Sequence, residues 1–237
     1  MDVSMFKSNK IGAYIFGIIL FNLFSANIWA QEQDPEMNYY VEVPRVFYGG
    51  LLVGTNFSQI DGDYYAGYHK LGLNVGGIAY AQLHKHLALS MEILYSEKGS
   101  KISTNDALRL AQVNGTTYAV TDYGIKLNYA EVPIMINYFD KRKSHAGIGF
   151  AYGRLVSATE NMTTAPAPPP VDLSKYEFRK DALDAIAGVD LHLWKGLFLN
   201  FRFQYSLLPV RDNIPPYFAR AKQYSNMYIL RLMYLFI

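Results

Sequence analysis

The sequence predicts an all-β fold, an eight-stranded antiparallel transmembrane β-barrel, with ten strands as the alternative. Segments in which apolar and polar residues alternate recur from Arg45 onward, and each is long enough to cross a hydrocarbon layer. The connections between them alternate between short and long. The last segment, 225–237, alternates strictly and ends beside the aromatic Phe236. Outer-membrane barrels combine these features, because their closing strand pairs with the first strand and leaves no free edge.

Residues 1–30 have the features of a secretory signal peptide. Two lysines give a basic start, an apolar run covers 11–24, and small residues follow as far as Ala30. The run is shorter than the roughly 20 residues that a transmembrane helix needs. We therefore expect cleavage after Ala30, with Ala26 as the second choice, and export of the mature chain.

Two further regions follow the signal peptide. Residues 31–44 are polar and acidic and are interpreted as a periplasmic lead-in, whereas 45–237 are expected to form the barrel. Export combined with membrane-spanning strands predicts the cell outer membrane as the location.

Composition excludes several classes of protein. The formal net charge is only +2, which gives no electrostatic case for binding nucleic acid. Cysteine is absent, so the chain has no disulfide, no thiolate metal site and no lipidated cysteine. After the signal peptide no apolar run approaches about 18 residues, so helical membrane spans are not expected.

Eight segments have the alternation and length of tilted membrane-spanning strands. In the clearest, 197–207, Leu, Phe and Tyr side chains form one face and mostly polar side chains the other. A water-soluble barrel would have its polar face outside, so an apolar outer face indicates contact with lipid. The predicted strands cover 45–58, 67–83, 87–99, 123–139, 145–157, 180–194, 197–210 and 224–237.

The connections predict the orientation of the barrel. Three are short, at 84–86, 140–144 and 195–196, and the other four are longer and polar. Bacterial barrels have short periplasmic turns and long extracellular loops.

The ten-strand alternative arises because Thr116–Val120 has the composition of an additional hairpin strand.

Seven ionisable residues are predicted to point into the lumen, because they lie on the polar face of their strands. An arginine that faced lipid near the midplane would cost about 2–4 kcal/mol. The predicted lumen charge network comprises Lys70, Glu92, Glu131, Asp184, Asp190, Arg202 and Arg231.

Counting residues from the periplasmic turns places Glu92, Glu131, Arg202 and Arg231 at similar heights. An eight-stranded barrel is only just wide enough for its own side chains, so we expect these charges to meet and close the bore. The favoured interpretation is a structural core, and an ion or proton path or an acid–base pair is the alternative.

Aromatic residues near the strand ends are expected to form the girdles that anchor a barrel at the two membrane interfaces. The predicted girdle residues are Tyr80, Tyr138, Tyr152, Tyr205, Tyr234 and Phe236.

The search for a catalytic or metal site gives no candidate that we adopt. His84 and His86 could face the same way at one turn, but histidine is common at interfaces and in turns. Ser90 and Ser96 face inward without a predicted lumenal histidine beside them, and a hydrolase needs a nucleophile and a base within reach. We therefore expect no enzyme activity, no metal and no cofactor.

Four segments, 49–77, 89–101, 129–138 and 178–193, resemble the PorT-like outer-membrane β-barrel family of Bacteroidetes. The most specific are the Gly-rich first hairpin and an inward glutamate followed by Tyr-Ser-x-Lys-Gly. The resemblance implies an eight-stranded outer-membrane barrel, and the founding member of the family is implicated in type IX secretion. The chain departs from the family pattern in having Asp184 and Asp190 where glycines are expected, and Met233 where the closing strand commonly has glycine.

The sequence thus predicts a structural or accessory component of an outer-membrane assembly, with a link to protein secretion implied by the resemblance. The expected partners are outer-membrane lipid and proteins of the outer membrane, and no small-molecule ligand is identified. Two alternatives stay open, an outer-membrane lipid-modifying enzyme and a protein that binds or adheres through its long loops.

Overall fold

The computed structural model describes residues 46–63, 67–102, 109–167, 169, 171–213 and 219–236. Every described residue belongs to one compact unit, Arg45–Ile237. The predicted signal peptide and periplasmic lead-in lie outside the described residues.

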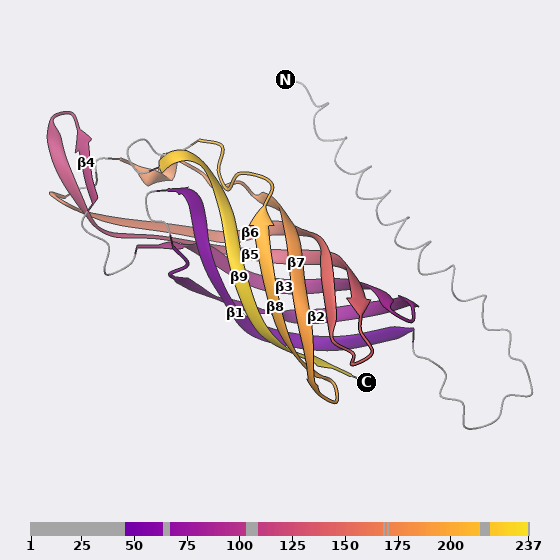
Figure 1. Ribbon diagram of the computed structural model, residues 1–237. Coiled ribbons are helices and arrows are strands. Elements are labelled where there is room, and N and C mark those ends of the chain that lie inside the picture. The colour runs from indigo at the N-terminus through magenta and orange to yellow at the C-terminus, as the bar shows by residue number, and fades with distance from the viewer. Residues whose placement is uncertain are drawn as a thin grey trace, which may run out of the picture. The chain divides into compact units, whose positions relative to one another are not determined.

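An antiparallel sheet closes on itself to form the barrel (Figure 1). Around the ring each strand pairs with its neighbours in the order β1, β2, β3, β5, β6, β7, β8, β9, and β9 returns to β1. The strands within the described residues are β1 (Phe47–Asp63), β2 (Lys70–His84), β3 (Leu87–Lys101), β4 (Arg109–Val113), β5 (Thr116–Phe139), β6 (His145–Ala165), β7 (Asp181–Trp194), β8 (Leu197–Ser206) and β9 (Ala219–Leu235). The predicted eight-stranded barrel is confirmed.

The additional hairpin at Thr116–Val120 exists, but it adds no strand to the ring. β4 pairs with the outer end of β5 alone, from Arg109 opposite Val120 to Val113 opposite Thr116. Asn114 and Gly115 join the two strands with φ values of 48° and 80°, and two positive φ values are what the type I′ hairpin turn requires. The ten-strand alternative is therefore wrong.

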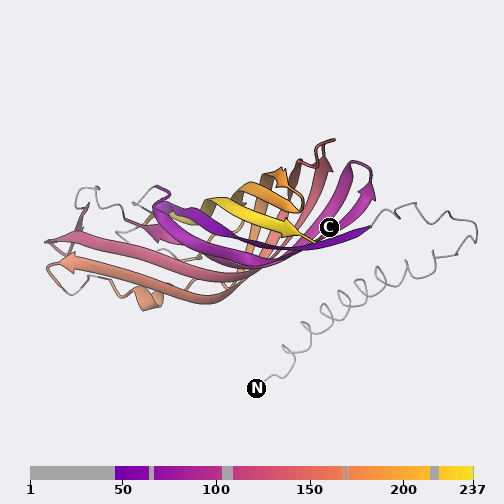
Figure 2. The ribbon, with the colours of Figure 1, turned by 90° about the horizontal axis from the view of Figure 1, so that it is seen from below.

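β5 and β6 are much longer than a membrane crossing requires. They have 24 and 21 residues, whereas about 9–11 residues suffice for a tilted transmembrane strand. They pair along nearly their whole length, as far as Ala119 opposite Ala165, and Figure 2 shows them running together past the other strands. The connection from β6 to β7 contains a short 3-10 helix, Leu173–Lys175. Among the described residues, no helix has the length and apolarity to cross a membrane.

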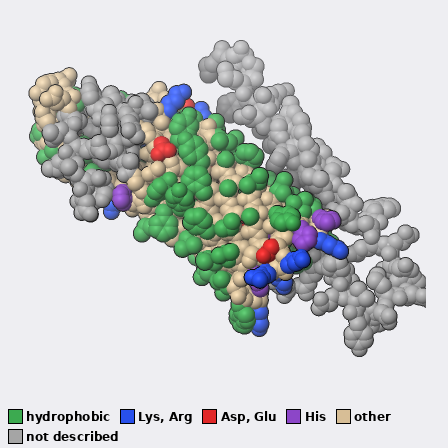
Figure 3. All heavy atoms as spheres, viewed as in Figure 1, with side chains coloured by type: hydrophobic (Ala, Val, Ile, Leu, Met, Phe, Trp, Pro, Cys, Tyr) green, Lys and Arg blue, Asp and Glu red, His purple; other side chains and the backbone are tan. Residues whose placement is uncertain are grey.

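The outer surface of the barrel is largely apolar. Along β3 the residues alternate between exposed and buried from Leu87 to Ser96, and the outward set is apolar. Ile93 and Ile148 are 68% and 69% exposed, values that a water-soluble sheet would avoid for large aliphatic side chains. Figure 3 shows hydrophobic side chains covering the visible side of the barrel wall.

The interior contains an apolar cluster toward each end. One cluster, toward the short turns, includes Leu52, Ile78, Phe198 and Met233, and the other includes Ile60 together with several residues of β5. Buried polar and charged residues of β3, β5, β7, β8 and β9 lie in the same interior. The lumen is thus filled by side chains, as expected for eight strands.

Gly54 allows β1 and β9 to approach closely beside a lumenal arginine. A Cβ atom at this position would lie 2.1 Å from the Leu230 carbonyl oxygen and 2.7 Å from Arg231 Cγ. Gly54 pairs with Arg231 in the register that closes the barrel. A larger residue at this seam would have to displace the backbone of β9.

Candidate functional site

Glu92 on β3 lies at the centre of a charged cluster inside the barrel. Its two oxygens accept hydrogen bonds of 2.6 and 3.1 Å from Arg202 on β8, and Oε2 accepts a third, of 3.0 Å, from Arg231 on β9. The three side chains are 1–3% exposed. Bidentate arginine–carboxylate pairs are strong, and removing one partner of a buried pair is costly. The cluster therefore joins β3 to β8 and β9 across the bore.

Hydrogen bonds continue from Arg231 toward the short turns. Its Nε donates to Asn200 Oδ1 over 2.8 Å, and Asn200 Nδ2 donates to Asp190 Oδ1 over 2.7 Å. Asp190 Oδ2 lies 3.3 Å from His145 Nε2, which a 2.9 Å hydrogen bond joins to the Tyr80 hydroxyl. We call the following residues the inner network: Glu92, Asp190, Asn200, Arg202 and Arg231. Its two carboxylates balance its two guanidinium groups.

A second buried cluster forms around Lys98 on β3. Its Nζ pairs with both Glu131 on β5 and Asp184 on β7, and it lies 5.0 Å from the centre of the Tyr129 ring. Gln204 Nε2 donates to Asp184 over 2.6 Å and to Glu131 over 3.3 Å. We call Lys98, Glu131, Asp184 and Gln204 the outer network. It joins β3, β5, β7 and β8, so the two networks together connect most of the ring.

A third contact lies beyond the outer network. Arg211, whose side chain is fully buried, donates to Glu160 over 2.9 Å and lies 4.0 Å from the centre of the Phe178 ring. Tyr123 donates to the same carboxylate over 2.7 Å. This contact fastens the segment after β8 to the long part of β6.

Six of the seven predicted lumen charges are at most 5% exposed and lie in these networks; they are Glu92, Glu131, Asp184, Asp190, Arg202 and Arg231. Lys70 is the exception, because it pairs with Glu97 and donates to the Leu71 carbonyl at the rim. Its side chain is 15% exposed. Lys70 is the first residue of β2, and at a strand end the side chain is free to turn toward a carboxylate outside the lumen.

The predicted single level of charges is wrong. Glu131 contacts Lys98 in the outer network rather than Arg202 or Arg231 in the inner network. Strands of a barrel tilt and are staggered relative to one another, so counting residues from a turn does not give height along the barrel axis. Because of this stagger, the lumenal charges predicted to lie at one level belong to two separate networks.

Sequence reasoning missed Lys98, which holds the outer network together. The alternation that places Glu92 inside places residues 94, 96 and 98 inside as well. The signal was therefore present, but Lys98 lies near the predicted strand end, where a lysine is ordinarily solvated. The polar residues Asn74, Asn200 and Gln204 were also not singled out, although each makes buried hydrogen bonds to these charges.

The predicted girdle residues do not all face outward. Tyr80 is 3% exposed and packs in the apolar cluster near the short turns, so its assignment to the girdle is wrong. The interior is apolar at this level, so inward and outward side chains of β2 are both apolar. Polarity therefore does not show which way Tyr80 points. The other predicted girdle side chains are 36–63% exposed; they are Tyr138, Tyr152, Tyr205, Tyr234 and Phe236.

The described residues contain no group of three or more acidic, histidine or cysteine side chains placed to hold a metal ion. The two inward serines considered as nucleophiles, Ser90 and Ser96, have amide partners, since Asn137 donates to Ser90 over 2.8 Å and Asn56 donates to Ser96 over 3.1 Å. His145 contacts Tyr80 and Asp190 instead of a serine. Neither inward serine is thus paired with a base in the described part of the barrel.

A closed antiparallel barrel with an apolar outer wall and charged side chains inside defines an integral outer-membrane protein. The chain belongs to the family described as the outer membrane protein beta-barrel domain, whose model matches residues 29–211. The protein is accordingly located in the outer membrane. No curated protein matches the sequence.

Several solved outer-membrane proteins are similar to the chain. Ail of Yersinia pestis is 10% identical, with 81% of this chain and 100% of that chain covered and a TM-score of 0.43. Neisserial surface protein A is 8% identical, with coverages of 80% and 97% and a TM-score of 0.42. OprG of Pseudomonas aeruginosa is 12% identical, with coverages of 80% and 94% and a TM-score of 0.37.

Proposed function

We propose that the protein is a structural or accessory component of an outer-membrane assembly and conducts no ions through its lumen. The observation that carries the proposal is the attachment of both Arg202 and Arg231 to Glu92 across the bore. An open conduit would need lumenal charges that face water, whereas these charges are buried and paired. The long β5–β6 pair then offers a contact surface beyond the membrane.

We expect the purified protein to give no porin-sized current in planar bilayers, because the two networks and the apolar clusters fill the bore. The measurement uses the wild type and Arg202→Ala, with a known porin as the positive control. Arg202→Ala should unfold at lower temperature without gaining steady conductance. Stable single channels from the wild type would contradict the closed lumen.

An accessory role also predicts protein neighbours in the outer membrane. Crosslinking in intact membranes, affinity purification and mass spectrometry should recover a defined partner with the full chain. The matched control is a variant whose β4–β5 hairpin is shortened but still closed by Asn114–Gly115. It tests whether the partner contacts the hairpin outside the membrane. Recovery of the monomer alone after crosslinking would count against the accessory role.

The resemblance to the PorT-like family supports a narrower proposal, in which the assembly takes part in protein secretion. Deletion of the gene should then lower the amount of secreted proteins while leaving other outer-membrane barrels at normal levels. Unchanged secretion would remove this link and leave the closed-lumen proposal intact.

Binding through the extracellular extension is the second candidate function. It is favoured by the length of β5 and β6, which continue past the membrane together with β4. Loss of binding to a surface or cell after trimming this extension, with the barrel still folded, would support it. We expect no enzyme activity on lipid. A change in the mass of lipid A after deletion of the gene would contradict this expectation.

A further inference from the structure

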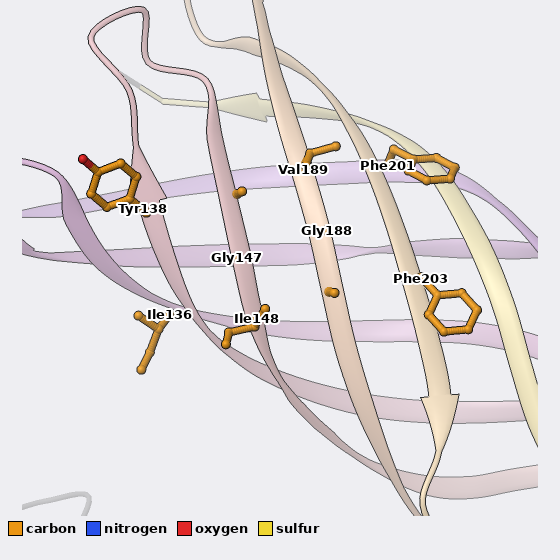
Figure 4. A pocket seen from close by; sticks show the side chains of 10 residues that line it. Ile136, Tyr138, Gly147, Ile148, Gly188, Val189, Phe201 and Phe203 are labelled. Carbon is orange, nitrogen blue, oxygen red and sulfur yellow. The ribbon is translucent and has the colours of Figure 1, made fainter.

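The lipid-facing wall of β5–β8 contains an apolar groove of about 550 Å³. Ile136 and Ile148 border one side, Phe201 and Phe203 border the other, and Ala187 lies between them, as Figure 4 shows for the labelled residues. Its volume falls in the range of about 300–1,000 Å³ that is common for ligand sites. Because this wall faces hydrocarbon, the groove can receive an extended acyl chain.

The groove ends at a basic turn. Tyr138 and Ala146 line it, are paired in register, and immediately flank the β5–β6 turn. That turn carries Lys141, Arg142 and Lys143, all exposed. Even at the full strand rise of about 3.3 Å per residue, the three residues from Tyr138 to Lys141 would span at most roughly 10 Å, which long basic side chains can bridge.

The short turns carry a net positive charge. The three short turns among the described residues contribute Lys85, Lys141, Arg142, Lys143 and Lys195, against the acidic Asp140. Asp140 accepts a hydrogen bond of 2.7 Å from the Arg142 backbone amide, so its carboxylate is directed toward the turn itself. Figure 3 shows Lys and Arg side chains, beside His side chains, at one end of the apolar wall, and others at its opposite end.

The β7–β8 turn adds an interfacial anchor. Trp194 is 65% exposed, and the Lys195 ammonium lies 4.5 Å from the centre of its ring. Tryptophan and lysine are typical of the headgroup level of a membrane. The short turns therefore lie at a headgroup level, and the pairing of short turns with long extensions at the opposite end assigns that level to the periplasmic leaflet.

We infer that the wall of β5–β8 holds one anionic glycerophospholipid of the periplasmic leaflet. One acyl chain occupies the groove, and the phosphate-bearing headgroup is bound by the side chains of Lys141 and Arg142. The apolar groove and the basic turn are continuous along β5 and β6, so a single amphipathic molecule satisfies both. The site is independent of the proposed assembly role, because it needs no protein partner.

Native mass spectrometry of the purified protein can test the site with equal amounts of phosphatidylglycerol and phosphatidylcholine that have the same acyl chains. We expect the wild type to retain one phosphatidylglycerol in preference to phosphatidylcholine. Lys141→Gln with Arg142→Gln should reduce this preference by about fivefold per charge. Lys85→Gln is the matched control at another short turn, and it should leave the preference unchanged.

The groove itself is tested by Ala187→Phe, which fills the space between Ile148 and Phe203. The acyl chain contacts hydrocarbon whether or not it lies in the groove, so filling the groove removes only van der Waals packing. We expect Ala187→Phe to retain measurably less lipid than the wild type. Ala79→Phe is the control, because Ala79 is also an exposed residue of the outer wall but lies on β2. Heat-dependent gel mobility verifies that each variant is folded.

Equal lipid retention by Ala187→Phe and Ala79→Phe would overturn the acyl-chain site. Equal retention of the two lipids by the wild type would overturn the headgroup site. The headgroup site would also be overturned if the double variant, Lys141→Gln with Arg142→Gln, still preferred phosphatidylglycerol to the same degree.

Discussion

Glu92 is the residue on which the inner network depends. Replacing it by glutamine keeps the shape but removes the one carboxylate that Arg202 and Arg231 both contact, and leaves Asp190 alone to balance two buried guanidinium groups. Breaking a buried ion pair in this way costs about 3–5 kcal/mol. We expect Glu92→Gln to lower the free energy of unfolding by that amount, measured by urea titration in detergent.

Asp181→Asn provides the comparison for Glu92→Gln. Asp181 accepts from Arg154 over 2.6 Å, but both side chains are about half exposed. Exposed pairs contribute roughly 0–1 kcal/mol. If Asp181→Asn were as damaging as Glu92→Gln, the special role of buried charge in the lumen would be refuted.

Individual residues also mark where sequence reasoning succeeds and fails. Arg202 and Arg231 are forced inward by the cost of facing lipid, and that cost can be read from the sequence. The partners of Glu131 cannot be read in the same way, because they depend on strand stagger. Tyr80 misleads because an aromatic residue near a strand end suits both an interfacial girdle and an apolar interior.

At the scale of an element, the seam between β1 and β9 depends on the absence of a side chain at Gly54. A Cβ atom there would collide with the backbone of β9. We expect Gly54→Ala to lower the free energy of unfolding by about 1–3 kcal/mol, as overpacking does, in the same urea titration.

Gly77→Ala is the matched control for the seam, because the nearest atom to its added Cβ would be the Gly50 carbonyl oxygen at an ordinary 3.7 Å. This substitution should change stability much less. Equal effects of the two substitutions would mean that general glycine flexibility, and not close approach of β1 to β9, sets the cost.

The strands themselves are largely predictable, because alternation identifies the segments that cross the membrane. Their outer ends are not, since β5 and β6 continue where the environment changes from lipid to water. Beyond the membrane both faces can be polar, so the pattern that identifies a spanning strand fades. For this reason β4 is absent from the eight predicted strands, and the hairpin appears only in the ten-strand alternative, although Asn114-Gly115 is a strong hairpin signal.

For the whole molecule, the asymmetry of turns and extensions predicts its orientation. The chain has no cysteine, so a single introduced cysteine can be labelled without background. In intact cells a membrane-impermeant maleimide should react with Thr117→Cys in the β4–β5 hairpin. Lys141→Cys, at a short turn, should react only after the outer membrane is permeabilised. The reverse pattern would show that the short turns face the outside of the cell.

The inner network links residues that are far apart along the chain. Glu92 belongs to the third strand, whereas its arginine partners follow 110 and 139 positions later on the last two strands. A partly assembled barrel in which β3 has not met β8 and β9 therefore holds these charges in its interior without their partners. Closure of the ring pairs them, so the same contact makes half-assembled forms unfavourable and the finished form hard to reopen.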